Sequence, residues 1–257
     1  MADDVRVELR DGALWLTLDR PETFNALTGA MVATLVRQIR GAVSREDVRV
    51  VVLTGTGDAF SAGADVSGAD AQDRYDAGSV DGANMLVTAI TEADQPVVCG
   101  LNGVAAGVGM SVALACDLVV ATESATLTLA FTRLGLMPDG GASATVAASI
   151  GRARAMRLAL LSDRIGAREA FDAGLVSHVF PDEEYDAGLA SVVERVAGGP
   201  PLAHAATKKA VNAATLGTLP GAFQRERAGQ SMLLRTSDVA EGMAAFNEKR
   251  RPDFRGR

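Results

Sequence analysis

Short runs of consecutive apolar residues alternate along most of the chain with longer stretches in which apolar residues recur every three or four positions. The short runs are rich in β-branched residues and predict strands, whereas the periodic stretches predict helices. Strands are expected at 14–18, 48–54, 96–101 and 117–122, and helices at 27–39, 83–93, 110–116 and 141–159. Repeated strand, turn and helix units indicate an α/β fold.

The last quarter of the chain has a different pattern. After Gly198 no strand pattern remains, and the segments 202–216, 219–235 and 237–250 all have helical periodicity. We therefore expect a core over 1–197 and a helical region over 198–257. This region is either an appendage, which could form oligomers, or a final layer on the same core.

Two glycine-bearing segments each follow a strand-like run, FSAGAD at 60–65 and NGVAAGVG at 102–109. Glycine lets a ligand approach the main chain closely, so the backbone N–H groups of such turns can point at a developing negative charge. The pair predicts an oxyanion hole, although each segment alone could be a tight connection between a strand and a helix. The polar stretch 66–82 between them is the best candidate for a mobile loop or lid.

Composition narrows the class of protein further. The chain has 257 residues, of which 48% are hydrophobic and 22% charged, enough to bury a full core. Its net charge of −7 argues against general nucleic-acid binding. No signal-peptide or membrane-spanning pattern is found, and the only two cysteines, Cys99 and Cys116, are expected as buried thiols in a reducing cytoplasm. No metal motif is found, so no metal is expected.

Six short segments, in this order, resemble those of the crotonase family, the enoyl-CoA hydratase/isomerase superfamily. They are DRP with NAL at 19–27, the two glycine segments, CD at 116–117, GLMP at 135–138, and AFNEKR at 245–250. The resemblance covers nearly the whole chain. It implies a spiral of ββα units with a C-terminal helical trimerisation region, a homotrimer or dimer of trimers, and a coenzyme A thioester as substrate without a separate cofactor.

The same resemblance assigns roles to individual residues. The backbone N–H groups of Ala64 and Val108 would hold the thioester oxygen, and the carbonyl of Ala62 would meet the adenine. Val108 replaces the usual glycine, so we expect it to narrow the pocket and to restrict φ at the turn. Phe246 and Lys249 match positions that reach the adenine and phosphate end from a neighbouring subunit in relatives, although Lys249 could simply end a helix. Other matched residues expected at the substrate site are Asp65, Gly107, Ser111 and Phe131.

The acid and base groups of a hydratase are missing. Hydratases of this family use two glutamates, and the matching positions here hold Ser111 and Phe131, which cannot exchange protons in that way. Either another acid, such as Asp70, Asp73 or Asp76, replaces them, or the reaction is different. The usual lysine after the AGxD motif is also absent.

Asp139 lies where several isomerases of the superfamily carry a catalytic aspartate. It would move a proton between carbons of an enolate, or it would only cap the helix that follows. Three functions remain open: an enoyl-CoA isomerase that uses Asp139, a hydratase with relocated groups, and a non-catalytic acyl-CoA-binding protein. Outside this site, Lys208 and Lys209 are expected on a solvated helix face, and Asp117 is expected to accept backbone hydrogen bonds.

Overall fold

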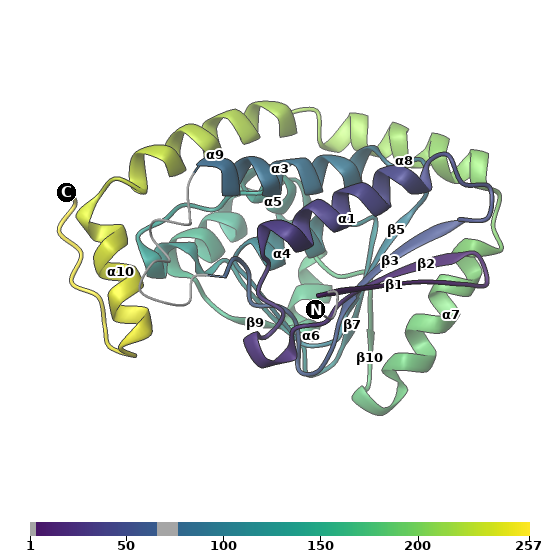
Figure 1. The fold of residues 1–257 in the computed structure, drawn as a ribbon, viewed down its shortest axis with the longest axis horizontal. Coiled ribbons are helices and arrows are strands. Elements are labelled where there is room, and N and C mark those ends of the chain that lie inside the picture. Colours follow the sequence, from purple (N-terminus) through teal and green to yellow (C-terminus); the bar gives the residue numbers. More distant parts are fainter. Residues whose placement is uncertain (1–3, 66–76) are drawn as a thin grey trace.

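The computed structural model describes residues 4–65 and 77–257, which form two sheets flanked by helices (Figure 1). Neighbouring strands of the larger sheet are parallel except for its first pair, and their spatial order is β1 (Val5–Arg10), β2 (Ala13–Leu18), β3 (Val50–Gly55), β5 (Val97–Leu101), β7 (Leu118–Thr122) and β10 (His178–Phe180). The smaller sheet has the order β4 (Ala59–Ser61), β6 (Val104–Ala106), β8 (Thr126–Thr128) and β9 (Ile165–Gly166).

The chain repeats one unit as it moves across these sheets. In each turn, a long strand joins the larger sheet, a short strand joins the smaller sheet, and a helix follows. Three such units are β3, β4 and α3 (Ala77–Glu92); β5, β6 and α4 (Val108–Ala115); and β7, β8 and α5 (Ala142–Leu161). The expected spiral of ββα units is therefore confirmed.

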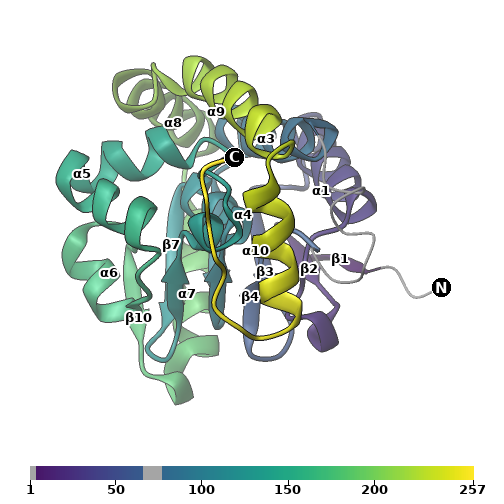
Figure 2. The same ribbon diagram turned by 90° about the vertical axis from the view of Figure 1, so that its left-hand side faces the viewer.

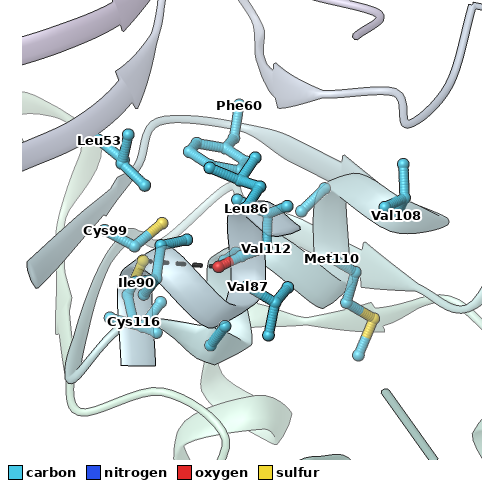
Figure 3. Packing of buried hydrophobic residues seen from close by; sticks show 14 of the residues in the cluster. Leu53, Phe60, Leu86, Val87, Ile90, Cys99, Val108, Met110, Val112 and Cys116 are labelled. Atoms are coloured by element: carbon cyan, nitrogen blue, oxygen red, sulfur yellow. Dashed lines mark hydrogen bonds between the residues drawn. The ribbon is translucent and has the colours of Figure 1, made fainter. Parts of the chain in front are cut away.

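The core lies between the larger sheet and the helices that cover it. β3 and β5 are buried along almost their whole length, which explains their nearly continuous apolar sequences. Figure 3 shows Leu53 and Phe60 packed with Leu86 and Ile90 of α3, all at most 1% exposed. Cys99 lies in the same cluster as a buried free thiol, and burial raises its pKa well above the usual range.

Two helices cover this core next to each other and form one side of the functional site. α1 (Gly29–Ala42) begins at Thr28, whose hydroxyl accepts a hydrogen bond from the Met31 amide (3.2 Å). The apolar residues that recur along α1 are buried, and α1 packs against α3. Figure 1 shows the two helices running alongside one another.

Two helix boundaries differ from the sequence prediction. Residues 77–82, which we expected in the loop, belong to α3, where Val80 is fully buried and Asp81 pairs with Arg227 of a distant helix (2.6 Å). These tertiary contacts outweigh the poor helix propensity of the segment. The helix expected over 141–159 is interrupted at Gly151, which has a non-helical backbone (φ 75°, ψ 162°). Residues 66–76 of the predicted loop lie outside the described residues.

The tail consists of α8 (Pro201–Thr215), α9 (Leu219–Leu233) and α10 (Ser237–Asn247), after α6 (Ala167–Ala173) and α7 (Tyr185–Ala197). α9 packs against α3 and α5, and α10 packs against the short helix η2 (Ala130–Leu134). Figures 1 and 2 show α10 at the end of the molecule opposite α7. In this chain the tail is thus a further layer on the core, and its role in oligomers stays a prediction.

The position of Lys208 in the tail differs from the sequence prediction. It does not lie on a solvated face, because it is 7% exposed and forms an ion pair with Asp117 (2.8 Å). Its ammonium also donates to the carbonyls of Ile90 (2.7 Å) and Gln95 (3.2 Å). Asp117 in turn accepts the Val97 amide (2.7 Å), as expected. Among the helices described, none is long and apolar enough to cross a bilayer.

Candidate functional site

The first glycine segment is held in place by the residues of the DRP and NAL motifs. Asn25, fully buried with a φ of 55°, donates to the carbonyls of Thr56 (2.9 Å) and Ala59 (2.7 Å). Arg20 donates to the Ala26 carbonyl (2.9 Å) and pairs with Asp65 (3.2 Å). These contacts fix both ends of the 60–65 segment, so Asp65 has a clear structural role there.

Two residues on the wall of the site have backbone amides without a hydrogen-bond partner among the described residues. Neither the Ala64 nor the Val108 amide donates a hydrogen bond within the described part of the chain. Val108 is the first residue of α4, where the helix leaves its N–H groups unpaired and the helix dipole favours negative charge. A Cβ added to Gly63 would lie 3.5 Å from the Val108 amide nitrogen, so the two segments meet closely. This proximity is compatible with the predicted oxyanion hole, which stays a prediction.

Valine in place of glycine at position 108 changes the volume of the site wall but does not change the backbone conformation of the turn. The left-handed φ of this turn falls on Gly107 (φ 53°, ψ −130°), while Val108 lies within the helix, so the expected restriction of φ does not occur. Gly107 is fixed by donating its amide to the Thr128 carbonyl (3.0 Å). The Val108 side chain is 6% exposed and occupies space in the wall of the site, as we expected.

Two cavities share the wall that carries these amides. The α1–α3 cavity, about 610 Å³, lies between α1 and α3 and is mainly apolar. The α10 cavity, about 360 Å³, is lined by Ala62, Gly107, Phe131 and Phe246, among other residues. Ala64 and Val108 line both cavities, so a group bound at the amides could extend into each.

Asp139 lies next to this wall but on neither cavity surface. Its carboxyl is fully buried, and its Oδ2 atom accepts a hydrogen bond from Gln230 of α9 (2.8 Å). The Ser111 hydroxyl donates to the backbone carbonyl of Asp139 (2.8 Å), so Ser111 supports the loop instead of facing the substrate. The next residue, Gly140, reaches the wall, because a Cβ there would lie 3.5 Å from Val108 Cγ2.

The helix after Asp139 is capped by a different residue. The Glu226 carboxylate, also from α9, accepts the amides of Gly141 (2.7 Å) and Ser143 (2.9 Å). No side chain of the 139–141 loop caps α5, so the alternative role for Asp139 as a helix cap is wrong. Burial raises the pKa of Glu226, and its hydrogen bonds from Ser143 and Gly141 oppose that shift.

Glu226 and Gln230 are the residues that the sequence analysis missed. They lie one helical turn apart on α9, both fully buried, and both hold the loop that carries Asp139. Gln230 also accepts the Met137 amide (3.2 Å). The only sequence signal was two polar residues at i and i+4 in a tail helix, a spacing that is common on solvated faces.

Of the remaining residues expected at the site, some line a cavity and others do not. Phe246 lines the α10 cavity from the chain's own α10, although it was expected to act from a neighbouring subunit. Lys249 is exposed beyond the end of α10, with a φ of 54°, and lines neither cavity. Asp70, Asp73 and Asp76 lie outside the described residues. Within 4–65 and 77–257, no three His, Cys, Asp or Glu side chains are grouped so that they could hold a metal ion.

The wall shared by the two cavities thus carries Ala64 and Val108, the residues whose amides the sequence analysis expected to hold a thioester oxygen. The family model for enoyl-CoA hydratase/isomerase matches residues 8–257, and the chain therefore belongs to this family of the crotonase superfamily, as its motifs predicted. It acts on coenzyme A thioesters, in keeping with the family.

Individual relatives are similar over nearly the whole chain. The crystal structure of an enoyl-CoA hydratase from Mycobacterium avium subsp. paratuberculosis K-10 is 45% identical, covers 98% of both chains and has a TM-score of 0.92. A probable enoyl-CoA hydratase of Rhodobacter capsulatus is 39% identical over 98% of both chains. A 1,2-epoxyphenylacetyl-CoA isomerase of Escherichia coli K12 is 34% identical over the full length of both.

Proposed function

We propose that this protein is an enoyl-CoA isomerase in which Asp139 moves the proton. The observation that carries the proposal is the pair of unengaged amides at Ala64 and Val108, on the wall shared by both cavities. The thioester oxygen binds there, coenzyme A extends into the α10 cavity towards Ala62 and Phe246, and the acyl chain enters the α1–α3 cavity.

The reaction that fits these groups needs one proton carrier. Asp139 lies behind the shared wall and on neither cavity surface, so the proposal requires its loop to bring the carboxyl to the carbon next to the thioester carbonyl. There it removes a proton, and the resulting enolate oxygen is stabilised by the two amides. The same carboxyl then returns the proton to a carbon further along the chain, which moves the double bond. Ser111 and Gln230 hold Asp139 through its backbone carbonyl and its Oδ2 atom, respectively.

Hydration is the second candidate because two of the relatives above carry that name. It needs one group to activate water and another to protonate the substrate. Ser111 already donates its hydroxyl to a backbone carbonyl, and Phe131 has no proton to exchange. The relatives also include a 34% identical protein named as an isomerase, of an epoxide-bearing CoA thioester, so the names of the relatives do not decide between the two reactions.

A substrate panel distinguishes these functions. The protein is incubated with 2-enoyl-, 3-enoyl- and dienoyl-CoA thioesters, and both water addition and double-bond migration are followed by absorbance and mass spectrometry. We expect migration without a mass increase. Water addition as the main reaction would favour the hydratase, and tight binding without any turnover would leave only an acyl-CoA-binding protein.

A further inference from the structure

The far end of the α1–α3 cavity carries two cations. Its wall near the amides is apolar, formed by residues such as Val32, Val36 and Leu86, whereas Arg37 and Arg40 line it further along α1. In an otherwise apolar cavity, a few polar groups fix the orientation and identity of the ligand. The position of the two arginines therefore bears on which acyl chains the cavity accepts.

These arginines have no acidic partner in the described part of the chain. Arg37 donates only to the Thr34 hydroxyl on the same helix (3.1 Å), and no ion pair involves Arg40. Other arginines of the protein do pair with carboxylates, such as Arg20 with Asp65 and Arg157 with Asp163. Asp65, the acidic residue that lines the same cavity, is thus held by Arg20 at the opposite end.

The distance along α1 sets the length of a fitting ligand. Each helical residue adds 1.5 Å, so Arg37 and Arg40 follow Thr28 by about 14 and 18 Å. Helical side chains lean towards the N-terminus, and the bond from Arg37 to Thr34 shows that lean. The Arg37 guanidinium therefore lies about 9 Å along the axis from Thr28, within reach of a medium-length acyl chain bound at Ala64 and Val108.

We propose that the α1–α3 cavity selects acyl-CoA thioesters whose chain ends in a carboxylate, which Arg37 and Arg40 bind. Guanidinium groups bind carboxylates through charge-assisted, often bidentate, hydrogen bonds. This inference rests on the proposed function only in placing the acyl chain in this cavity. It names a substrate class, the ω-carboxyacyl-CoA thioesters, for that cavity.

Binding of unreactive saturated ligands tests the proposal without requiring turnover. Dissociation constants are measured by calorimetry for sebacoyl-CoA and decanoyl-CoA, which differ only in the terminal carboxylate. We expect the full-length protein to bind sebacoyl-CoA about fivefold more tightly at low salt, with a smaller preference at high salt because both arginines are exposed.

Three variants locate the effect. Arg37→Gln combined with Arg40→Gln should remove the preference and leave decanoyl-CoA binding unchanged, and the double lysine variant should retain part of it. Arg152→Gln, an exposed arginine of α5 that lines neither cavity, should keep the full preference.

Each other outcome overturns the proposal in a distinguishable way. Equal affinity of the wild type for both ligands would show that the terminal carboxylate is not recognised. Equal weakening of both ligands in the double glutamine variant would assign the arginines to the phosphates of coenzyme A. Failure of both ligands to bind the wild type would refute the thioester site itself, and the proposed function would fail together with this inference.

Discussion

Replacing Gln230 with leucine tests whether the tail helix α9 positions the proton carrier. Leucine has a similar volume but removes the donor to Asp139 Oδ2 (2.8 Å) and the acceptor of the Met137 amide (3.2 Å). The Asp139 bond is buried and the Met137 bond is partly buried, so water cannot easily replace the Gln230 side chain as their partner.

The expected magnitudes follow from these two hydrogen bonds. Loss of a bond to a charged group costs about 1.5–3 kcal/mol, and an unpaired buried amide costs about 1–3 kcal/mol, so the free energy of unfolding should fall by about 2.5–6 kcal/mol. A misplacement of a catalytic group by about 1 Å can cost on the order of 10²-fold in rate. We therefore expect kcat for isomerisation to fall about 10- to 100-fold, while the Kd for a saturated acyl-CoA changes less than about twofold.

Steady-state kinetics, calorimetry and urea denaturation measure these three quantities. Ser231→Ala is the matched control, because Ser231 is the next residue of α9 and its hydroxyl has no hydrogen-bond partner within the residues described. This variant should change stability by less than about 0.5 kcal/mol and leave kcat unchanged. A Gln230→Leu variant that is less stable but retains full kcat would refute a positioning role.

Three further predictions concern the surroundings of the site. Burial raises the pKa of Glu226 above its usual 4.5, so the folded state binds the extra proton and the free energy of unfolding should fall as pH rises from about 4.5. Glu226→Gln should flatten this fall when the free energy of unfolding is measured by urea titration between about pH 4 and 8. An unchanged dependence of that free energy on pH would contradict a raised pKa of Glu226. Lys208→Met leaves the half-buried Asp117 without its counter-charge and should cost about 2–4 kcal/mol of unfolding free energy. The exposed Lys209→Met should cost less than about 1 kcal/mol, and equal losses would contradict the assignment of Lys208 as a buried ion-pair partner. Val108→Gly keeps the amide but removes three buried carbons, so it should cost about 2–3 kcal/mol of stability and retain acyl-CoA binding, whereas loss of binding would show that the side chain, not the amide, holds the ligand.

The fold was predictable from the sequence where a segment was long and its period regular. β3 and α1 have the expected type and nearly the expected bounds, because a buried strand is continuously apolar and an amphipathic helix repeats every three or four residues. The second strand of each ββα unit has only three residues, as in β4 and β6, and such a strand is too short to show a period. Family resemblance, not periodicity, indicated these strands.

The site was predictable as far as it depends on local sequence. Gly63 and Gly107 mark the two turns that bring the amides of Ala64 and Val108 together, and both turns could be identified from their glycines. Contacts between distant segments could not. The burial of Lys208, for example, depends on carbonyls more than a hundred residues earlier in the chain.

The support of Asp139 was hidden for the same reason. Gln230 lies 91 residues after Asp139, and Glu226 lies 85 residues after the Gly141 amide that it accepts. Both residues belong to a tail that the sequence alone left open between an appendage and a final layer. Since α9 contacts the loop that carries Asp139, the tail supports this loop in its own chain.

The proposed isomerisation depends most directly on Asp139 as the proton carrier, and Asp139→Asn tests this role. Asparagine keeps the size of the side chain and an oxygen that can accept the Gln230 donor, but it cannot take up a proton from the substrate. The measurement is the rate of conversion of a 3-enoyl-CoA to the 2-enoyl-CoA, with acyl-CoA binding measured on the same preparation. We predict a loss of about 10²- to 10⁴-fold in kcat with unchanged binding. Double-bond migration at the wild-type rate in this variant would contradict the role of Asp139 as the proton carrier.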